Sequence, residues 1–131
     1  MTADLQYLAS STALTFVMLL SASLIRARAW TMQGTLIAFG NRDDLPEPTP
    51  LSGRADRAAR NMLENLVLFT AALLVARLGG ADPTMTASAS AIFFWARVAY
   101  FPVYLAGIPY VLTAIWGVGV YAVAMLLLAA H

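Results

Sequence analysis

Long runs without acidic or basic side chains alternate with short polar segments along this chain. Residues 5–25 contain no charged side chain and are about long enough to cross a hydrocarbon core of roughly 30 Å. Residues 98–130 are also uncharged but too long for one span, and they break at Gly107 and Pro109, a helix stop followed by a proline-first start. The pattern predicts membrane-spanning helices at about 4–28, 83–106 and 109–130.

A further span is less obvious because its apolar part is short. Residues 66–76 supply only about half the length that a span requires, and the sequence GGADP at 79–83 ends the helix there. To cross a membrane, a helix at about 55–79 must therefore include the polar turns before Leu66. Ionisable groups at that depth are costly and normally face a bundle interior or a wet cavity.

Together these segments predict an all-α fold, an integral membrane four-helix bundle that forms a single domain over residues 1–131. Residues 29–54 are expected as a loop, and the prolines at 46, 48 and 50 predict an extended segment that is either a solvated linker or a lid. Arginines cluster in or beside this loop, and neither terminus has positive charge nearby. The positive-inside rule then predicts a cytoplasmic loop and periplasmic termini in a bacterial inner membrane.

Composition agrees with a membrane protein. Hydrophobic residues make up 60% of the chain and charged residues 11%, and the mean hydropathy is +0.72. A net charge of +1 gives no indication of a nucleic-acid partner. Because the chain has no cysteine, disulfides, thiolate metal sites and cysteine nucleophiles are excluded, and no metal site is predicted. If the protein catalyses a reaction of a thiol, that thiol must belong to a bound ligand.

Helical geometry gathers the polar side chains of two spans into stripes. At about 100° per residue, a stripe roughly 140° wide on the second span contains Arg57, Arg60, Asn61, Glu64 and Asn65. On the third span, a stripe roughly 60° wide contains Arg97, Tyr100 and Tyr104.

A pocket between these stripes would suit a small zwitterionic peptide with more than one carboxylate, because guanidinium, carboxylate, amide and phenol groups complement such a ligand. Alternatively, the polar groups satisfy one another, with Arg60 paired to Glu64 and Arg97 extended to the interface. Since four short helices cannot hide both stripes within one subunit, we also expect an oligomer.

Two segments resemble a known family. RAARNMLEN at 57–65 and ARVAYFPVYLAGIPY at 96–110 are similar to the second- and third-helix motifs of the MAPEG family, membrane-associated proteins in eicosanoid and glutathione metabolism. The resemblance covers nearly the whole chain. It implies a homotrimer with the co-substrate glutathione bound between neighbouring subunits. The glutathione-binding residues that it implies are Arg26, Arg57, Arg60, Asn61, Glu64, Arg97, Tyr100 and Tyr104.

One position departs from the family pattern. Active members commonly stabilise the glutathione thiolate with an arginine near the start of the fourth helix, where this chain has Leu112. Tyr104 and Arg97 are the remaining catalytic candidates.

The resemblance implies a glutathione-dependent membrane transferase or peroxidase that acts on small hydrophobic electrophiles. The alternative is a catalytically silent relative that binds glutathione or a lipid-like ligand. A small multidrug transporter fits less well, since such transporters keep a glutamate in the first helix, and residues 5–25 have none.

Overall fold

The computed structural model describes residues 1–129, and these residues form helices without β-strands. The helices are α1 (Ala3–Ala27), α2 (Met32–Phe39), α3 (Pro50–Leu78), α4 (Pro83–Ala106) and α5 (Pro109–Ala129). The four long helices, α1, α3, α4 and α5, are each long and apolar enough to cross a membrane. The predicted all-α membrane bundle is therefore confirmed; Ala130, the expected last residue of the fourth span, and His131 lie outside the described residues.

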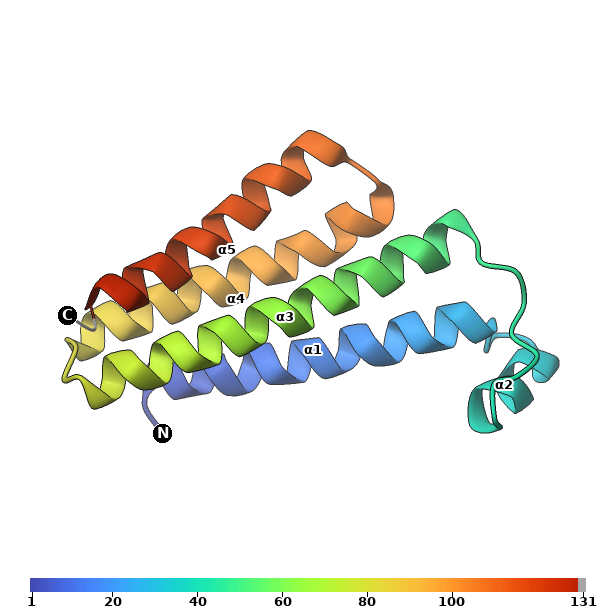
Figure 1. Ribbon diagram of the computed structural model, residues 1–131, viewed down its shortest axis with the longest axis horizontal. Helices are drawn as coiled ribbons and strands as arrows, with labels where there is room; N and C mark the ends of the chain where they lie inside the picture. Colours follow the sequence, from blue (N-terminus) through green and yellow to red (C-terminus); the bar gives the residue numbers. More distant parts are fainter. Residues whose placement is uncertain (130–131) are drawn as a thin grey trace.

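The four long helices run side by side along the bundle axis (Figure 1). α3 contacts α1, α4 and α5, and α4 also packs against α1 and α5. The N-terminus and the α3–α4 turn lie at one end of the bundle, whereas α2 and the α4–α5 turn lie at the other (Figure 1). We call the end that contains α2 the loop end.

Local signals account for where the helices begin and end. α3 begins at Pro50, earlier than the expected residue 55, because Thr49 and Ser52 form a reciprocal capping box ahead of the polar turns. Asp82 caps α4 through the backbone N–H of Thr84. Gly107, with φ of 74°, ends α4 in a left-handed conformation that favours glycine.

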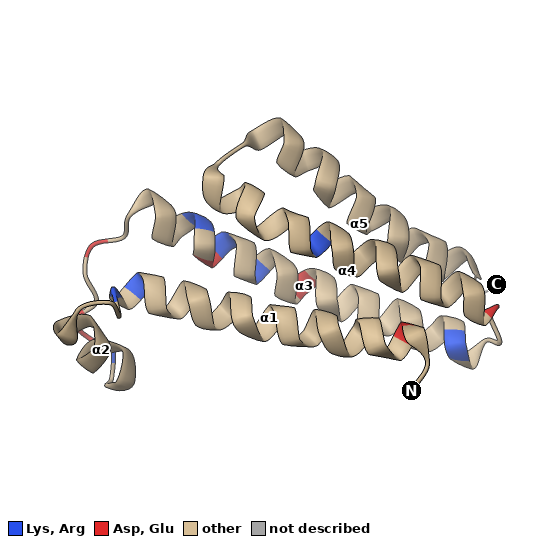
Figure 2. Cartoon of the chain, turned by 180° about the vertical axis from the view of Figure 1, so that it is seen from behind, with Lys and Arg blue, Asp and Glu red and all other residues tan. Residues whose placement is uncertain are grey.

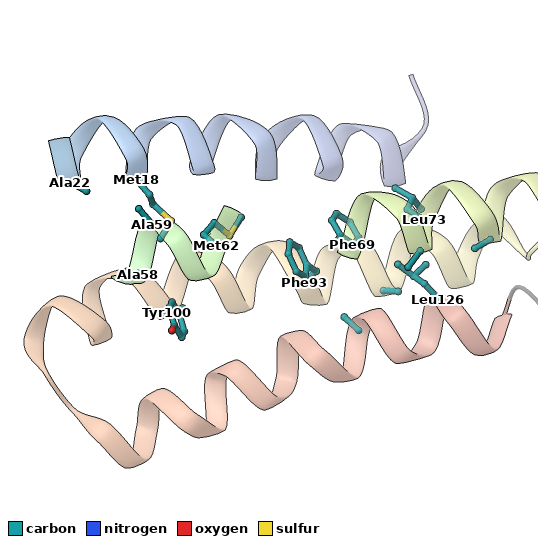
Figure 3. Close-up of a cluster of buried hydrophobic side chains, with 14 of the residues drawn as sticks. Met18, Ala22, Ala58, Ala59, Met62, Phe69, Leu73, Phe93, Tyr100 and Leu126 are labelled. Carbon is teal, nitrogen blue, oxygen red and sulfur yellow. The ribbon is translucent and has the colours of Figure 1, made fainter. Parts of the chain in front are cut away.

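Small side chains allow α3 to approach its neighbours closely. Ala55, Ala58 and Ala59 are buried near the loop end, and farther along the bundle the rings of Phe69 and Phe93 stack with centroids 4.2 Å apart. Figure 3 shows Phe69 and Phe93 in the space between the helices, in the same buried cluster as the alanines. Membrane helices associate through such packing because lipid tails are as apolar as the side chains themselves. This core holds the polar faces of α3 and α4 in a defined register.

The helix α2 lies within the segment expected as a loop. It is attached to the end of α1 by hydrogen bonds: Thr35 Oγ1 donates to the Ala29 carbonyl at 2.7 Å, and Arg42 Nη2 donates to the Ser23 carbonyl at 2.9 Å. Arg26 also donates to the carbonyl of Pro46. α2 is thus fixed beside the end of α1, whereas residues 45–49, which lead to α3, form neither helix nor strand.

Candidate functional site

Arg97 is the most unusual residue in the interior, because its long cationic side chain is only 1% exposed. Its Nη2 donates to Asn61 Oδ1 at 2.7 Å, and its Nε faces Met62 Sδ at 3.3 Å. The guanidinium carbon lies 4.1 Å from the centroid of the Tyr100 ring, a cation–π contact. Among residues 1–129, no carboxylate forms an ion pair with it. Within residues 1–129, Arg97 is therefore a positive charge held by neutral groups.

A glycine in α5 lies beside the stem of this arginine. A Cβ placed on Gly119 would lie 3.8 Å from Arg97 Cδ, an ordinary van der Waals distance, so alanine would fit there and only a larger side chain would crowd the arginine stem. Gly119 belongs to the small-residue segment GVGVYA at 117–122, whose composition indicates a helix-packing surface rather than a binding site. The glycine contributes space to the site rather than chemistry.

The polar stripes of α3 and α4 meet near the loop end. Arg57 Nε donates to the Tyr104 hydroxyl at 3.3 Å, and the rings of Tyr100 and Tyr104 lie 5.4 Å apart. Asn65 Nδ2 donates to the Asn61 carbonyl at 2.8 Å and approaches Asn61 Oδ1 at 3.2 Å, which orients the amide that receives Arg97. We call this group the α3–α4 polar cluster; its members are Arg57, Asn61, Asn65, Arg97, Tyr100 and Tyr104.

Arg26 and Arg60 do not belong to this cluster within one subunit. They line a separate hollow of about 330 Å³ between α1 and α3, together with Arg42 and Asp56. The six residues 57, 61, 65, 97, 100 and 104 lie on the α4 side of α3 instead. The structure thus divides the expected binding residues between two sides of α3.

Glu64 lies exposed on α3 and forms no ion pair among residues 1–129. The pairing of Arg60 with Glu64 is therefore not formed within the subunit, and Arg97 turns inward to Asn61 instead of extending to the interface. The two contacts named for the interpretation in which the polar groups satisfy one another are therefore absent. Other members of the stripes do bond to each other, as Arg97 does to Asn61 and Arg57 to Tyr104. Both Arg60 and Glu64 remain available to a ligand or a neighbouring subunit.

Leu112 occupies the position where an arginine is expected. Its side chain is half-buried and packs against the apolar core at the start of α5. The chain contains no arginine after Arg97, so α5 brings no positive charge to the cluster. Any cation that acts on a bound thiol must therefore come from outside α5.

A second polar group, at the end opposite to α2, was not anticipated. Arg77 Nη1 donates to both carboxylate oxygens of Asp4, at 2.8 and 2.7 Å, and Thr86 Oγ1 donates to Asp4 Oδ2 at 2.9 Å. In Figure 2, acidic and basic positions also lie at the end away from α2, near the N-terminus. The group joins α1, α3 and α4, and we call it the Asp4 clamp.

Fold and site together define an integral membrane protein of four spans with a polar cluster set into its bilayer-crossing helices. A model of the MAPEG family matches residues 5–131. The chain belongs to the MAPEG family, which contains glutathione-dependent transferases and synthases. A search of curated proteins returned no significant match.

Proposed function

We propose that this protein is a glutathione-dependent transferase or peroxidase that acts on hydrophobic electrophiles, with glutathione bound between neighbouring subunits. The observation that supports the proposal most directly is the buried guanidinium of Arg97, which is held by Asn61 and Tyr100 and has no carboxylate partner within residues 1–129. A buried positive charge without a counter-ion is expensive, and an anionic ligand would offset that cost.

The groups around Arg97 fit the polar parts of glutathione. Exposed Arg57 suits its carboxylates, Glu64 suits its ammonium group, and the Asn61 amide suits its peptide bonds, while buried Arg97 adds positive charge beneath them. Arg57 and Glu64 are exposed in the subunit, so a ligand can reach them without displacing the core. This donor set is the support for glutathione in particular rather than for a neutral lipid.

Binding between subunits follows from the exposure of these charges. α3 has 29 residues and is therefore about 43 Å long, so only its first turns extend beyond a core of about 30 Å. Glu64 lies well inside the membrane-crossing part, where contact with lipid would be costly. We propose that a neighbouring subunit covers this face in a trimer, and that Arg26 and Arg60 join the cluster across that interface.

Glutathione supplies the thiol that the chain itself lacks. In the proposed reaction, the α3–α4 polar cluster holds the peptide, Arg97 provides positive charge, and Tyr104 provides a hydroxyl donor near the sulfur. Positive charge and hydrogen-bond donors stabilise a thiolate, which is the nucleophilic form. The apolar surfaces of the spans supply the route for a hydrophobic substrate.

The second candidate function, which Leu112 favours, is binding of glutathione or a lipid-like ligand without catalysis. A half-buried leucine at the start of α5 contributes no charge to a sulfur atom, so glutathione could bind there without being activated. Both candidates share the same ligand site. They differ only in whether the bound thiol ionises at neutral pH.

We further propose that the loop end faces the cytoplasm. Most arginines of α1 and α3 lie at that end in Figure 2, and the arginine at the opposite end, Arg77, is neutralised by Asp4. The polar cluster then opens toward the compartment that contains glutathione. A C-terminal reporter that folds only in the periplasm should be active in this orientation.

The experiment that tests the proposal measures glutathione binding by calorimetry in detergent, with Arg57→Gln compared with Arg28→Gln. Arg57 contacts Tyr104, whereas Arg28 lies exposed at the end of α1, outside the cluster. We expect Arg57→Gln to weaken binding by about tenfold or more and Arg28→Gln to leave it unchanged. No binding by the wild type would refute the site.

Turnover separates the two candidates. Conjugation of an aryl halide by the wild type would establish the transferase, and binding without turnover or thiolate would favour the silent relative.

Native mass spectrometry in mild detergent tests the trimer: a stable monomer would contradict the proposal that neighbours complete the site.

A further inference from the structure

We propose that α2 is an in-plane membrane helix that lies in the surface of the lipid leaflet at the loop end, with its outward apolar side chains in the acyl-chain boundary. This inference rests on the placement of α2 against α1 and does not depend on the proposed glutathione chemistry.

The first observation is a stripe of exposed apolar side chains on α2. Met32 is 84% exposed, Leu36 71% and Phe39 85%. Because they follow one another at intervals of four and three residues, they lie within about 60° of each other on one side of the helix. Trp30, 70% exposed, precedes the same helix. Large apolar side chains gathered in this way mark a surface that is covered in the working protein.

The second observation is that the opposite side of α2 is fixed to the end of α1. Gly34 is buried there, and a Cβ at this position would overlap the carbonyl oxygen of Arg28. Only glycine permits so close an approach between α2 and that backbone. The hydrogen bonds from Thr35 to Ala29 and from Arg42 to Ser23 add to the attachment. The apolar stripe therefore has a fixed direction relative to the bundle.

The third observation places α2 at the level of the membrane surface. α1 has 25 residues and is about 37 Å long, slightly more than a hydrocarbon core of about 30 Å, so its last turn reaches the headgroup region. Arg42, which follows α2, bonds to Ser23 within that last turn. The segment consequently folds back beside the end of the span. In Figures 1 and 2, α2 lies beside the end of α1, on the side away from α4 and α5.

A lipid leaflet suits this stripe better than a protein partner. α2 has eight residues and is about 12 Å long, so its outward side is several times smaller than the roughly 800 Å² that each partner buries in a stable interface. Among the helices of residues 1–129, α2 contacts α1 only. Trp30 at one end suits the interfacial region, where tryptophan is enriched, and the arginines at 28 and 42 suit anionic headgroups.

The test uses the full-length protein in nanodiscs of phosphatidylcholine and phosphatidylglycerol. Because the chain has no cysteine, a single nitroxide label can be attached through Leu36→Cys without removing native thiols. Accessibility to oxygen, which concentrates in lipid, is compared with accessibility to a water-soluble nickel chelate. Glu47→Cys, exposed in the same loop, is the matched control for water, and Val17→Cys, exposed on α1, is the control for lipid.

We expect the ratio of oxygen to nickel accessibility at Leu36→Cys to exceed that at Glu47→Cys by about tenfold, with a depth of about 5–10 Å below the headgroups. A ratio equal to that of Glu47→Cys would mean that α2 lies in water and would overturn the proposal. Low accessibility to both reagents would mean that protein, such as a second copy of the chain, covers the stripe, and would also overturn it.

A second variant checks the attachment to α1. Gly34→Leu forces a side chain against the Arg28 carbonyl and should release α2 from α1. If α1 sets the direction of the stripe, the label at Leu36→Cys should lose its single depth in this background, whereas the Val17→Cys label should not change. An unchanged depth at position 36 would contradict the role given to the α1 contact.

Discussion

The Asp4 clamp offers the sharpest test of how the spans are held together. Asp4→Asn removes the negative charge but keeps the size of the side chain. Arg77 Nη1 donates to both Asp4 oxygens and Thr86 Oγ1 donates to one of them, so an amide NH₂ in place of either oxygen faces a donor. The substitution therefore costs an ion pair and leaves two donors poorly matched.

The exposure of the two side chains sets the expected size of the loss. The Asp4 side chain is 4% exposed, whereas the Arg77 side chain is 37% exposed. Breaking a fully buried pair costs about 3–5 kcal/mol, and an exposed pair contributes about 0–1 kcal/mol. Because solvent screens Arg77 in part, we expect Asp4→Asn to lower the free energy of unfolding by about 2 kcal/mol. For a chain of this length, that corresponds to a fall in melting temperature of about 5–10 °C.

The assay is thermal unfolding in mild detergent, with a second acid at the same end as control. Asp82 is exposed and caps α4 through the Thr84 N–H, a role that asparagine performs as well, so Asp82→Asn should change stability by less than about 0.5 kcal/mol. Arg77→Gln and the double variant complete a mutant cycle. A coupling energy near zero between positions 4 and 77 would refute the reasoning, because it would mean that the ion pair contributes nothing.

Three further outcomes follow from the structure. Glu64→Gln should weaken glutathione binding by about tenfold or destabilise the oligomer, and unchanged calorimetry and native mass spectra would exclude a role for this carboxylate. Leu112→Arg should increase the ultraviolet absorbance of bound thiolate and any conjugating activity; strong thiolate absorbance in the wild type would instead point to Arg97 with Tyr104. Ser11→Ala should raise the free energy of unfolding by about 0.5–1 kcal/mol, since the buried Ser11 hydroxyl has no partner within residues 1–129, and a lower melting temperature would show that it has one in the assembly.

The short helix α2, between the first two spans, could not be predicted from local sequence patterns. α2 contains eight residues, too few for a stable isolated helix, and it was expected as loop. It forms because Gly34 permits contact with the end of α1, because Arg42 bonds to that helix, and because Thr35 bonds to Ala29 just after it. Those contacts depend on how the chain folds back, which residue periodicity does not report. The early start of α3 is different, since its Thr49–Ser52 capping box is a local signal that can be read from the sequence.

The residues of the α3–α4 polar cluster could be grouped by helix face from the sequence, but the contacts between them could not be predicted. Periodicity alone grouped Arg57 and Asn61 on one face of α3, and Arg97 and Tyr104 on one face of α4. Periodicity could not predict that buried Arg97 donates a hydrogen bond to Asn61. Nor could it predict that Arg60 lines the hollow between α1 and α3 rather than joining the polar cluster. Those outcomes depend on the rotation of each helix about its axis, which neighbouring helices determine through packing.

The sequence by itself determined the four spans and their polar stripes, because length, hydropathy and helical periodicity are properties of neighbouring residues in the chain. Only the tertiary structure decided which polar groups meet. Asp4 and Arg77 are 73 positions apart, and Asn61 and Arg97 are 36 apart, yet each pair lies within hydrogen-bonding distance. The physical reason is that a hydrogen bond requires atoms about 3 Å apart, and such distances between separate helices are set by the packing of the apolar core.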